Sequence, residues 1–362
     1  MKKVKFCLLI IALLISAFAL PASAVSAEEI LDEYEQALPD GAADVKDFDA
    51  LSDAVGFERL FEQVADVLSE KRAELISFFL SLLAITVLSS IARFFGSSAT
   101  FGEFSDLLST ACSAVCGVFI FERLRSLIST VSAAIDELSA FFSTLVPIAT
   151  AITASGGGAT TAGVQASGMS LSLGIVGGVA SGILLPLVSV AFALAFVGAI
   201  SSDAAITAIS KTVRGIFNSI LGALSFILGS SLSLQTVIAA ATDSMAMRAA
   251  RYAASSIPVV GQTVSSSLST LASGLSYAKS AVGVSAVSVI LGISIAPLLT
   301  LAIFRISLDV CASVGAMLSS PVSAYLSSLK GALDSLIGVF LFCGLVYAFQ
   351  IIIFMKCGVA LL

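Results

Sequence analysis

Long runs of uncharged, mostly apolar residues constrain this chain more than any other feature. The longest extends from Leu138 to Ser202, and runs of 18 to 28 residues occupy 75–92, 215–242, 280–304 and 335–355. About 20 apolar residues in a helix cross the hydrocarbon core of a bilayer. Lipid offers no hydrogen bonds to the backbone, so runs of this length span it as helices. The chain is therefore predicted to be an all-α, polytopic integral membrane protein.

The composition also argues against several classes of function. Only 12% of the residues are charged and 58% are hydrophobic, whereas soluble globular chains carry about 25% charged residues. His and Trp are absent, so imidazole acid–base chemistry and nucleophiles activated by His cannot operate. The net charge of -6 disfavours nucleic-acid binding. We expect no enzymatic activity, no cofactor and no metal centre.

The N-terminus has the pattern of a secretory signal peptide over residues 1–27. Three lysines within the first five residues precede an apolar run, and a small-residue stretch follows it. Cleavage after Ala24 or after Ala27 fits this stretch. The alternative is an uncleaved first membrane helix. Both interpretations place the next segment outside the cytoplasm.

An acidic region follows, from Glu28 to Glu74. It holds 15 acidic residues against four basic ones, whereas the chain beyond Glu74 holds nine acidic and 11 basic residues. Apolar residues between Leu51 and Val67 recur at three to five positions, which predicts one or two amphipathic helices. The region is expected to act as a docking surface or as a solvated helical spacer outside the cytoplasm.

The rest, residues 75–362, is predicted to be a polytopic membrane domain of about seven spans, with six to eight possible. The run 138–202 is long enough for three helices, with breaks at 155–163 and near Gly182 and Pro186. The 15-residue segment Leu107 to Phe121 is short for a span. If it dips in and returns, seven basic residues face the cytoplasm and four lie outside, so the positive-inside rule favours seven spans and a cytoplasmic C-terminus.

Two Ser-rich stretches resemble neither spans nor ordinary loops. Residues 252–278 carry a stripe of Val264, Leu268, Leu271 and Leu275, and a similar stripe runs from Val322 to Leu336. Such helices lie in the membrane interface, pack between subunits, or line a wet passage with hydroxyl groups.

Glycines mark two further features. Gly174, Gly178 and Gly182 recur at four-residue spacing, which predicts a helix face where another backbone approaches closely, either within the chain or in an oligomer. Gly156, Gly157 and Gly158 form a triple glycine with no Lys-Ser or Lys-Thr after it, as a phosphate-binding loop requires. This triplet is interpreted as a helix break or hinge.

Ionisable residues beside apolar segments are the other candidates, because burying them in lipid is costly. They are Asp203, Asp243, Arg305, Asp309 and Asp334. Arg305 and Asp309 are four residues apart and can bridge on one helix face. All five lie at segment edges, and no carboxylate is expected at mid-span, which argues against an ion-coupled transporter.

Two local stretches carry a resemblance to a known family. One is LVPIATAITASGGGATTAG at 145–163, and the other extends from Ala241 to Gly283. In the second, a Thr-Asp pair, basic residues and an Ile-Pro-Val-Val-Gly turn fall on Thr242, Asp243, Arg248, Arg251, Ile257, Pro258, Val259 and Gly261. With the signal peptide, the acidic region and the polytopic body, they resemble the stage III sporulation protein AE family of endospore-forming bacteria.

The resemblance implies a role in sporulation. Members of that family belong to a multiprotein assembly in the mother-cell-derived membrane around the forespore, which meets a forespore membrane partner. The assembly resembles a secretion system or feeding channel needed for late forespore gene expression. We expect this chain to be a membrane subunit in an oligomer or heteromeric complex. A secondary transporter with helices broken at Pro147, Gly156 to Gly158, Pro186 and Pro297, or a pore-less scaffold, are the alternatives.

Overall fold

The structure is a computed structural model that describes residues 57–96, 102–155, 159–200, 204–255, 261–318 and 322–356. Within these ranges the side chains of 57–63, 95–96, 102–110, 112–113, 159, 199–200, 204–207, 236, 238–273 and 275 are not described. The elements are α4 (Phe57–Gly96), α5 (Gly102–Ser155), α6 (Ala159–Gly174), the π-helix η1 (Ile175–Leu184), α7 (Leu185–Ile200), α8 (Ala204–Ser255), α9 (Gly261–Met317) and α10 (Val322–Lys356). The described chain is entirely helical, as predicted.

Six helices in the described chain are long and apolar enough to cross a membrane. This number lies within the predicted range of six to eight. The segment Leu107 to Phe121 does not dip and return, because it belongs to α5, which continues past Glu122 and Arg125 to Ser155. Charged residues on one face of a long helix leave its backbone hydrogen bonds intact. The seventh span, and the argument for a cytoplasmic C-terminus that depended on it, are therefore not supported.

The helices also continue through the prolines that were expected to break them. Pro147 lies inside α5 and Pro297 lies inside α9. Near Gly182 and Pro186 the chain forms one rod of α6, η1 and α7, so the run 138–202 supplies two candidate spans and not three. Pro186 has no N–H for an α-helical bond, and η1 directly before it uses the wider register, with the Leu185 N–H donating to the Ala180 carbonyl.

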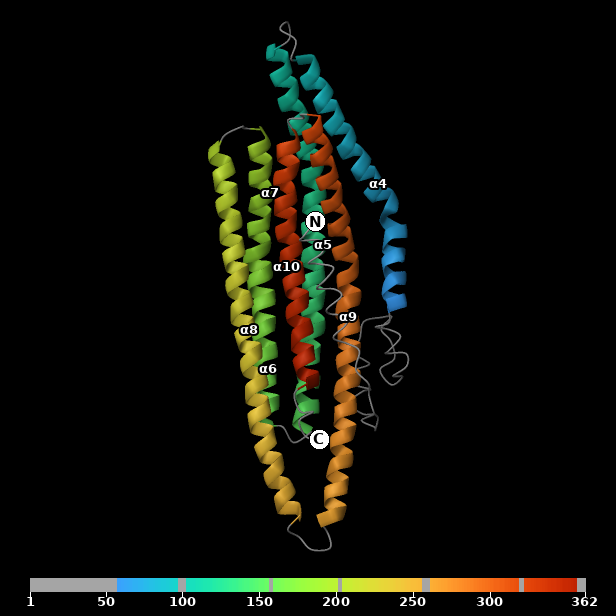
Figure 1. Ribbon diagram of the computed structural model, residues 1–362, viewed down its shortest axis with the longest axis vertical. Helices are drawn as coiled ribbons and strands as arrows, with labels where there is room; N and C mark the ends of the chain where they lie inside the picture. The colour runs from blue at the N-terminus through green and yellow to red at the C-terminus, as the bar shows by residue number, and fades with distance from the viewer. Residues whose placement is uncertain are drawn as a thin grey trace.

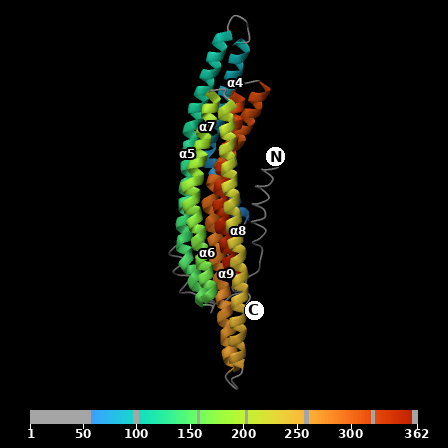
Figure 2. The same ribbon diagram turned by 90° about the vertical axis from the view of Figure 1, so that its left-hand side faces the viewer.

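The helices form an elongated bundle with an extension at each end. At the lower end of Figure 1, α8 and α9 run together beyond the other helices, and at the upper end α4 and the start of α5 do so (Figures 1 and 2). The lower extension contains much of the stretch 252–278. This Ser-rich stretch is therefore divided between the end of α8 and the start of α9, and the second stretch is the first part of α10.

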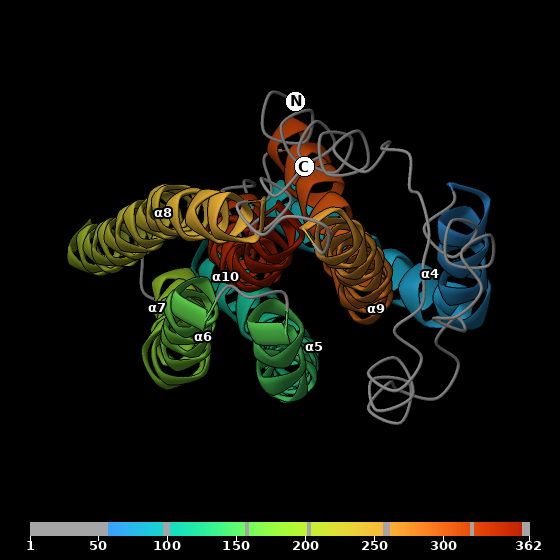
Figure 3. The same cartoon turned by 90° about the horizontal axis from the view of Figure 1, so that it is seen from below.

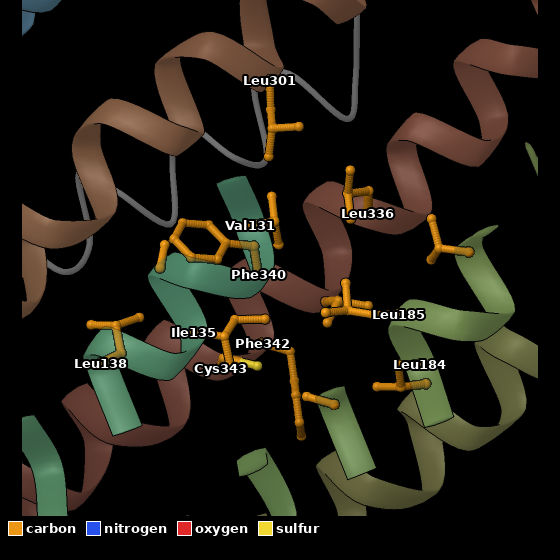
Figure 4. Close-up of a cluster of buried hydrophobic side chains, with 14 of the residues drawn as sticks. Val131, Ile135, Leu138, Leu184, Leu185, Leu301, Leu336, Phe340, Phe342 and Cys343 are labelled. Atoms are coloured by element: carbon orange, nitrogen blue, oxygen red, sulfur yellow. The ribbon is translucent and has the colours of Figure 1, made fainter. Parts of the chain in front are cut away.

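The core lies around α10. Seen from below, α10 is surrounded by α5, α8, α9 and the rod of α6 and α7 (Figure 3). Buried side chains from these helices meet there, among them Ile135, Leu185, Leu301 and Phe340 (Figure 4). Since burial in lipid removes no apolar surface from water, this packing is stabilised mainly by close van der Waals contact.

Contacts between helices define the depth of the apolar layer. At one level, Arg305 of α9 pairs with Asp334 of α10. At the other, Gly283 of α9 lies against Met355 of α10, next to Lys356. The 22 residue steps from Asp334 to Lys356 correspond to about 33 Å of helix. This matches a hydrocarbon core of about 30 Å, so the charged residues mark its two boundaries.

Candidate functional site: a polar groove at bilayer depth

A groove of about 900 Å³ lies between α5 and α9. One wall is formed by Gly292, Ile293, Ala296 and Pro297 of α9. The other is a polar stripe along α5 that consists of Glu122, Arg125, Ser126, Ser129, Thr130, Ala133 and Glu137, with Ala134 beside it. These positions recur at three or four residues, which is the repeat of one helix face. The continuous helix α5 is what aligns them.

The groove lies at the depth of the apolar layer. Ser139, two residues after Glu137, shares a hydrogen bond of 2.9 Å with the Tyr347 hydroxyl, and the rings of Phe142 and Tyr347 stack at 4.3 Å between centroids. Tyr347 is 13 residues from Asp334 and nine from Lys356. Glu137 is therefore well inside the layer, and Glu122, 15 residues earlier, lies near its charged boundary.

The groove carries charge without an internal neutralising partner for Glu137. Glu122, Arg125 and Glu137 are exposed, and no ion pair among the described residues involves them. A carboxylate facing hydrocarbon costs several kcal/mol, so such residues face water or a protein neighbour. The expectation that no carboxylate lies at mid-span was wrong, because it assumed that the chain leaves the bilayer between Phe121 and Leu138.

A layer of ion pairs between α9 and α10 lies at the boundary of the apolar layer near Glu122. Arg305 Nε lies 2.5 Å from Asp334 Oδ1, and Lys330 pairs with Asp309. Arg214 of α8 reaches the same layer, where it donates hydrogen bonds to the Ser328 carbonyl and hydroxyl. Arg305 and Asp309 thus do not bridge along α9 as expected. Each instead pairs with a residue of α10, so the two ion pairs join α9 to α10. The paired residues are 29 and 21 positions apart in sequence.

The glycine ridge of Gly174, Gly178 and Gly182 faces outward. A Cβ added at any of the three would meet nothing within 4 Å among the described residues, so the ridge does not pack inside this chain. Close approach occurs at other glycines, where an added Cβ would overlap a neighbouring side chain: Phe196 at Gly117, Gln235 at Gly168, Met355 at Gly283 and Arg214 at Gly331.

The remaining predicted residues give less structural information. Thr242, Asp243, Arg248 and Arg251 lie on the last turns of α8 and Gly261 begins α9, but their side chains are outside the described part. Pro258, Asp203 and Gly156 to Gly158 lie outside the described residues altogether. The glycine triplet falls between the end of α5 at Ser155 and the start of α6 at Ala159.

Sequence reasoning missed the groove, although its signal is present. Glu122, Ser126, Ser129, Ala133 and Glu137 have helical spacing, but the charges around residue 122 were interpreted as the end of a membrane segment. Continuing the helical repeat across those charges would have revealed the polar face.

Among the described residues, no group of three or more Asp, Glu or Cys side chains could hold a metal ion.

These features define a class of protein: a polytopic helical membrane protein with a polar groove open on one side at bilayer depth. Comparison with known proteins then identifies the family. The family model for stage III sporulation protein AE matches residues 45–359, so the chain belongs to this family, which confirms the resemblance drawn from its motifs.

A curated relative is the stage III sporulation protein AE of Bacillus subtilis (strain 168). It is 26% identical over 197 residues, which cover 53% of this chain and 49% of the relative. The aligned region thus spans about half the length of that relative. No solved structure matches the chain.

Proposed function

We propose that this chain is a membrane subunit of a sporulation-specific secretion or feeding-channel complex between mother cell and forespore, needed for late forespore gene expression. Membership of the stage III sporulation protein AE family supports the sporulation role. The groove between α5 and α9 is the one observation that carries the channel role, because it aligns polar side chains from Glu122 to Glu137 at bilayer depth.

The groove supports a role within an assembly. Lipid cannot solvate Glu137, and the walls that α5 and α9 supply leave one side open. In the proposed complex a neighbouring subunit covers that side, and the enclosed space holds water. Partners are other membrane proteins of the same complex and a forespore membrane protein, and the site of action is the membrane that surrounds the forespore.

Cysteine accessibility in membrane vesicles prepared from sporulating cells tests this role. Ala133 lies on the groove wall, and Ala223 is an exposed alanine of α8 at similar depth, nine residues from Arg214. We expect a membrane-impermeant thiol reagent to label Ala133→Cys and to spare Ala223→Cys, in chains whose native cysteines are replaced. Labelling of neither residue in vesicles from cells that assemble the complex would contradict a water-filled path and would favour a scaffold without a pore.

Glu137 favours a second candidate, a secondary transporter of a small solute, because a carboxylate at mid-layer is suited to ion or proton coupling. Glu137→Gln separates the two functions. It abolishes uptake driven by a proton or ion gradient in a transporter, whereas a channel keeps gradient-independent permeation. The measurement is solute flux into vesicles from sporulating cells, with and without an imposed gradient.

A further inference from the structure

Three buried glutamines lie inside the bundle, away from the groove of α5 and α9. Gln165 of α6, Gln235 of α8 and Gln350 of α10 are 3%, 5% and 1% exposed. Gln350 Nε2 donates to the Gly168 carbonyl at 3.0 Å and to the Ser172 hydroxyl at 2.7 Å. The Gln235 amide lies directly against Gly168, where an added Cβ would overlap it. Gly168 is therefore the meeting point of α6, α8 and α10.

Each of these amides has one unpaired end. Gln165 accepts from the Thr153 hydroxyl at 2.9 Å, and Gln235 donates to the Ser231 hydroxyl at 3.2 Å. Gln165 Nε2, Gln235 Oε1 and Gln350 Oε1 have no hydrogen-bond partner among the described residues. Hydroxyl groups both donate and accept, so turning the amide of Gln165 or Gln235 only exchanges which end is unpaired.

Buried polar atoms without a partner inside a membrane bundle favour the binding of a small polar molecule. Each buried polar group without a partner costs of the order of 1–3 kcal/mol in proteins, and more in contact with hydrocarbon. Gln350 is six residues from Lys356 at the edge of the apolar layer, about 9 Å along the helix. The Gln350 amide is therefore buried a short distance from the aqueous side.

A groove reaches one of these glutamines, Gln235. It lies between α6 and α8, has a volume of about 840 Å³, and includes both Gly168 and Gln235 in its lining. Thr160, at the start of the membrane-spanning rod, lines its outer end, and Ser167 lies next to Gly168. Because α8 runs antiparallel to α6 (Figure 1), Ser230 and Ser231 lie deeper than Gln235, among apolar lining residues such as Leu171 and Phe226. The Gln235 amide thus has hydroxyl groups on both sides of it along the groove.

We propose that Gln235 and Gln350, which both contact Gly168, form a binding site for a small uncharged molecule that both donates and accepts hydrogen bonds. An amide offers a donor end and an acceptor end, which suits water, urea or a polyol. No charged side chain is among the described residues that line this groove, so an ion would lack a counter-charge. The site is separate from the channel groove, and the proposal does not depend on the proposed function.

The full chain in proteoliposomes tests this site. In a chain whose native cysteines are replaced, Ser231→Cys places a thiol on the groove wall beside Gln235, and Ser225→Cys places one on the exposed surface of the same helix. We expect a small charged thiol reagent to react at least tenfold faster with Ser231→Cys. Equal rates at the two positions would overturn the proposal, because the groove would then be as dry as the lipid-facing surface.

Gln235→Met tests the role of the amides, since Met has nearly the shape of Gln without its polar end. It removes only the bond to Ser231, so the fold is expected to persist, and gel filtration checks this. Labelling of Ser231→Cys should fall at least fivefold in Gln235→Met. An unchanged rate in Gln235→Met and also in Gln350→Met would overturn the role of the glutamines.

Added solutes identify the occupant. Urea or glycerol that slows the labelling of Ser231→Cys, relative to raffinose at equal osmolarity, identifies a solute site. If neither solute slows it, water is the occupant. Both outcomes support the proposed hydrogen-bonding site, whereas slowing by raffinose alone would show an osmotic effect on the bundle and would contradict it.

Discussion

At the residue scale, the structure separates glycines that permit packing inside the chain from glycines that leave a surface open. Gly117 is buried and an added Cβ would overlap the Phe196 ring, whereas Gly174 is exposed with nothing near it. Sequence spacing predicted the second group and could not reveal the first. Isolated glycines have no spacing to detect, and their role depends on the side chain that lies opposite.

Gly117→Ala and Gly174→Ala should therefore change stability in opposite directions. Alanine in a helix is favoured over glycine by about 1 kcal/mol, and Gly174 has helical dihedral angles, so Gly174→Ala should stabilise slightly. At Gly117 the overlap with Phe196 should exceed this gain, since overpacking costs about 1–3 kcal/mol. Thermal unfolding of the detergent-solubilised chain measures both. A melting temperature for Gly117→Ala equal to or above that of the parent would contradict the packing.

The outward glycine ridge predicts an effect on assembly. Gly178→Leu places a bulky side chain on a surface where a partner helix is expected to approach closely, while Gly222 of α8 is equally open. We expect Gly178→Leu to reduce recovery of the assembled complex on native gels several-fold, and Gly222→Leu to leave it near the parental level. Loss of assembly in both variants, or in neither, would remove the special role of the ridge.

At the element scale, the sequence indicated helices and their approximate number, but not where they end or how they pair. Uncharged runs predict spans because lipid selects for them. Charges do not end helices, however, and α5 continues through Glu122 and Arg125. Likewise, Arg305 and Asp309 have ideal spacing for a bridge within α9. They pair with α10 instead, because Asp334 lies opposite Arg305 and Lys330 lies opposite Asp309.

A double-mutant cycle on Arg305 and Asp334 tests the ion-pair layer. Their side chains are 15% and 31% exposed, against 38% and 50% for the pair of Arg123 and Glu74. We expect a coupling energy of about 1–2 kcal/mol for the first pair, within the range for contacting residues. The second pair should give less than about 1 kcal/mol, as surface pairs do. Coupling energies in the reverse order would show that the layer does not hold α9 to α10.

At the scale of the whole molecule, an even number of crossings fixes the relative position of the ends. With six spans, the start of α4 and the end of α10 lie on the same side of the membrane. The predicted signal peptide would place the start of α4 outside the cytoplasm, and an epitope tag after Leu362 should then be accessible from outside in protoplasts of non-sporulating cells that produce the chain. A tag after Leu362 that becomes accessible only after permeabilisation would restore the odd span count expected from the basic residues.

The extension of α8 and α9 beyond the lower boundary has a practical consequence. Gly283 lies at the level of Met355, so the first 22 residues of α9, from Gly261, stand outside the lipid, over about 33 Å. A protease acting between α8 and α9 would sever the chain away from the described core around α10. Both fragments would stay anchored by their own membrane helices, and α10 packs against helices of both. Cleavage there would therefore cut the polypeptide while the helix bundle stays assembled.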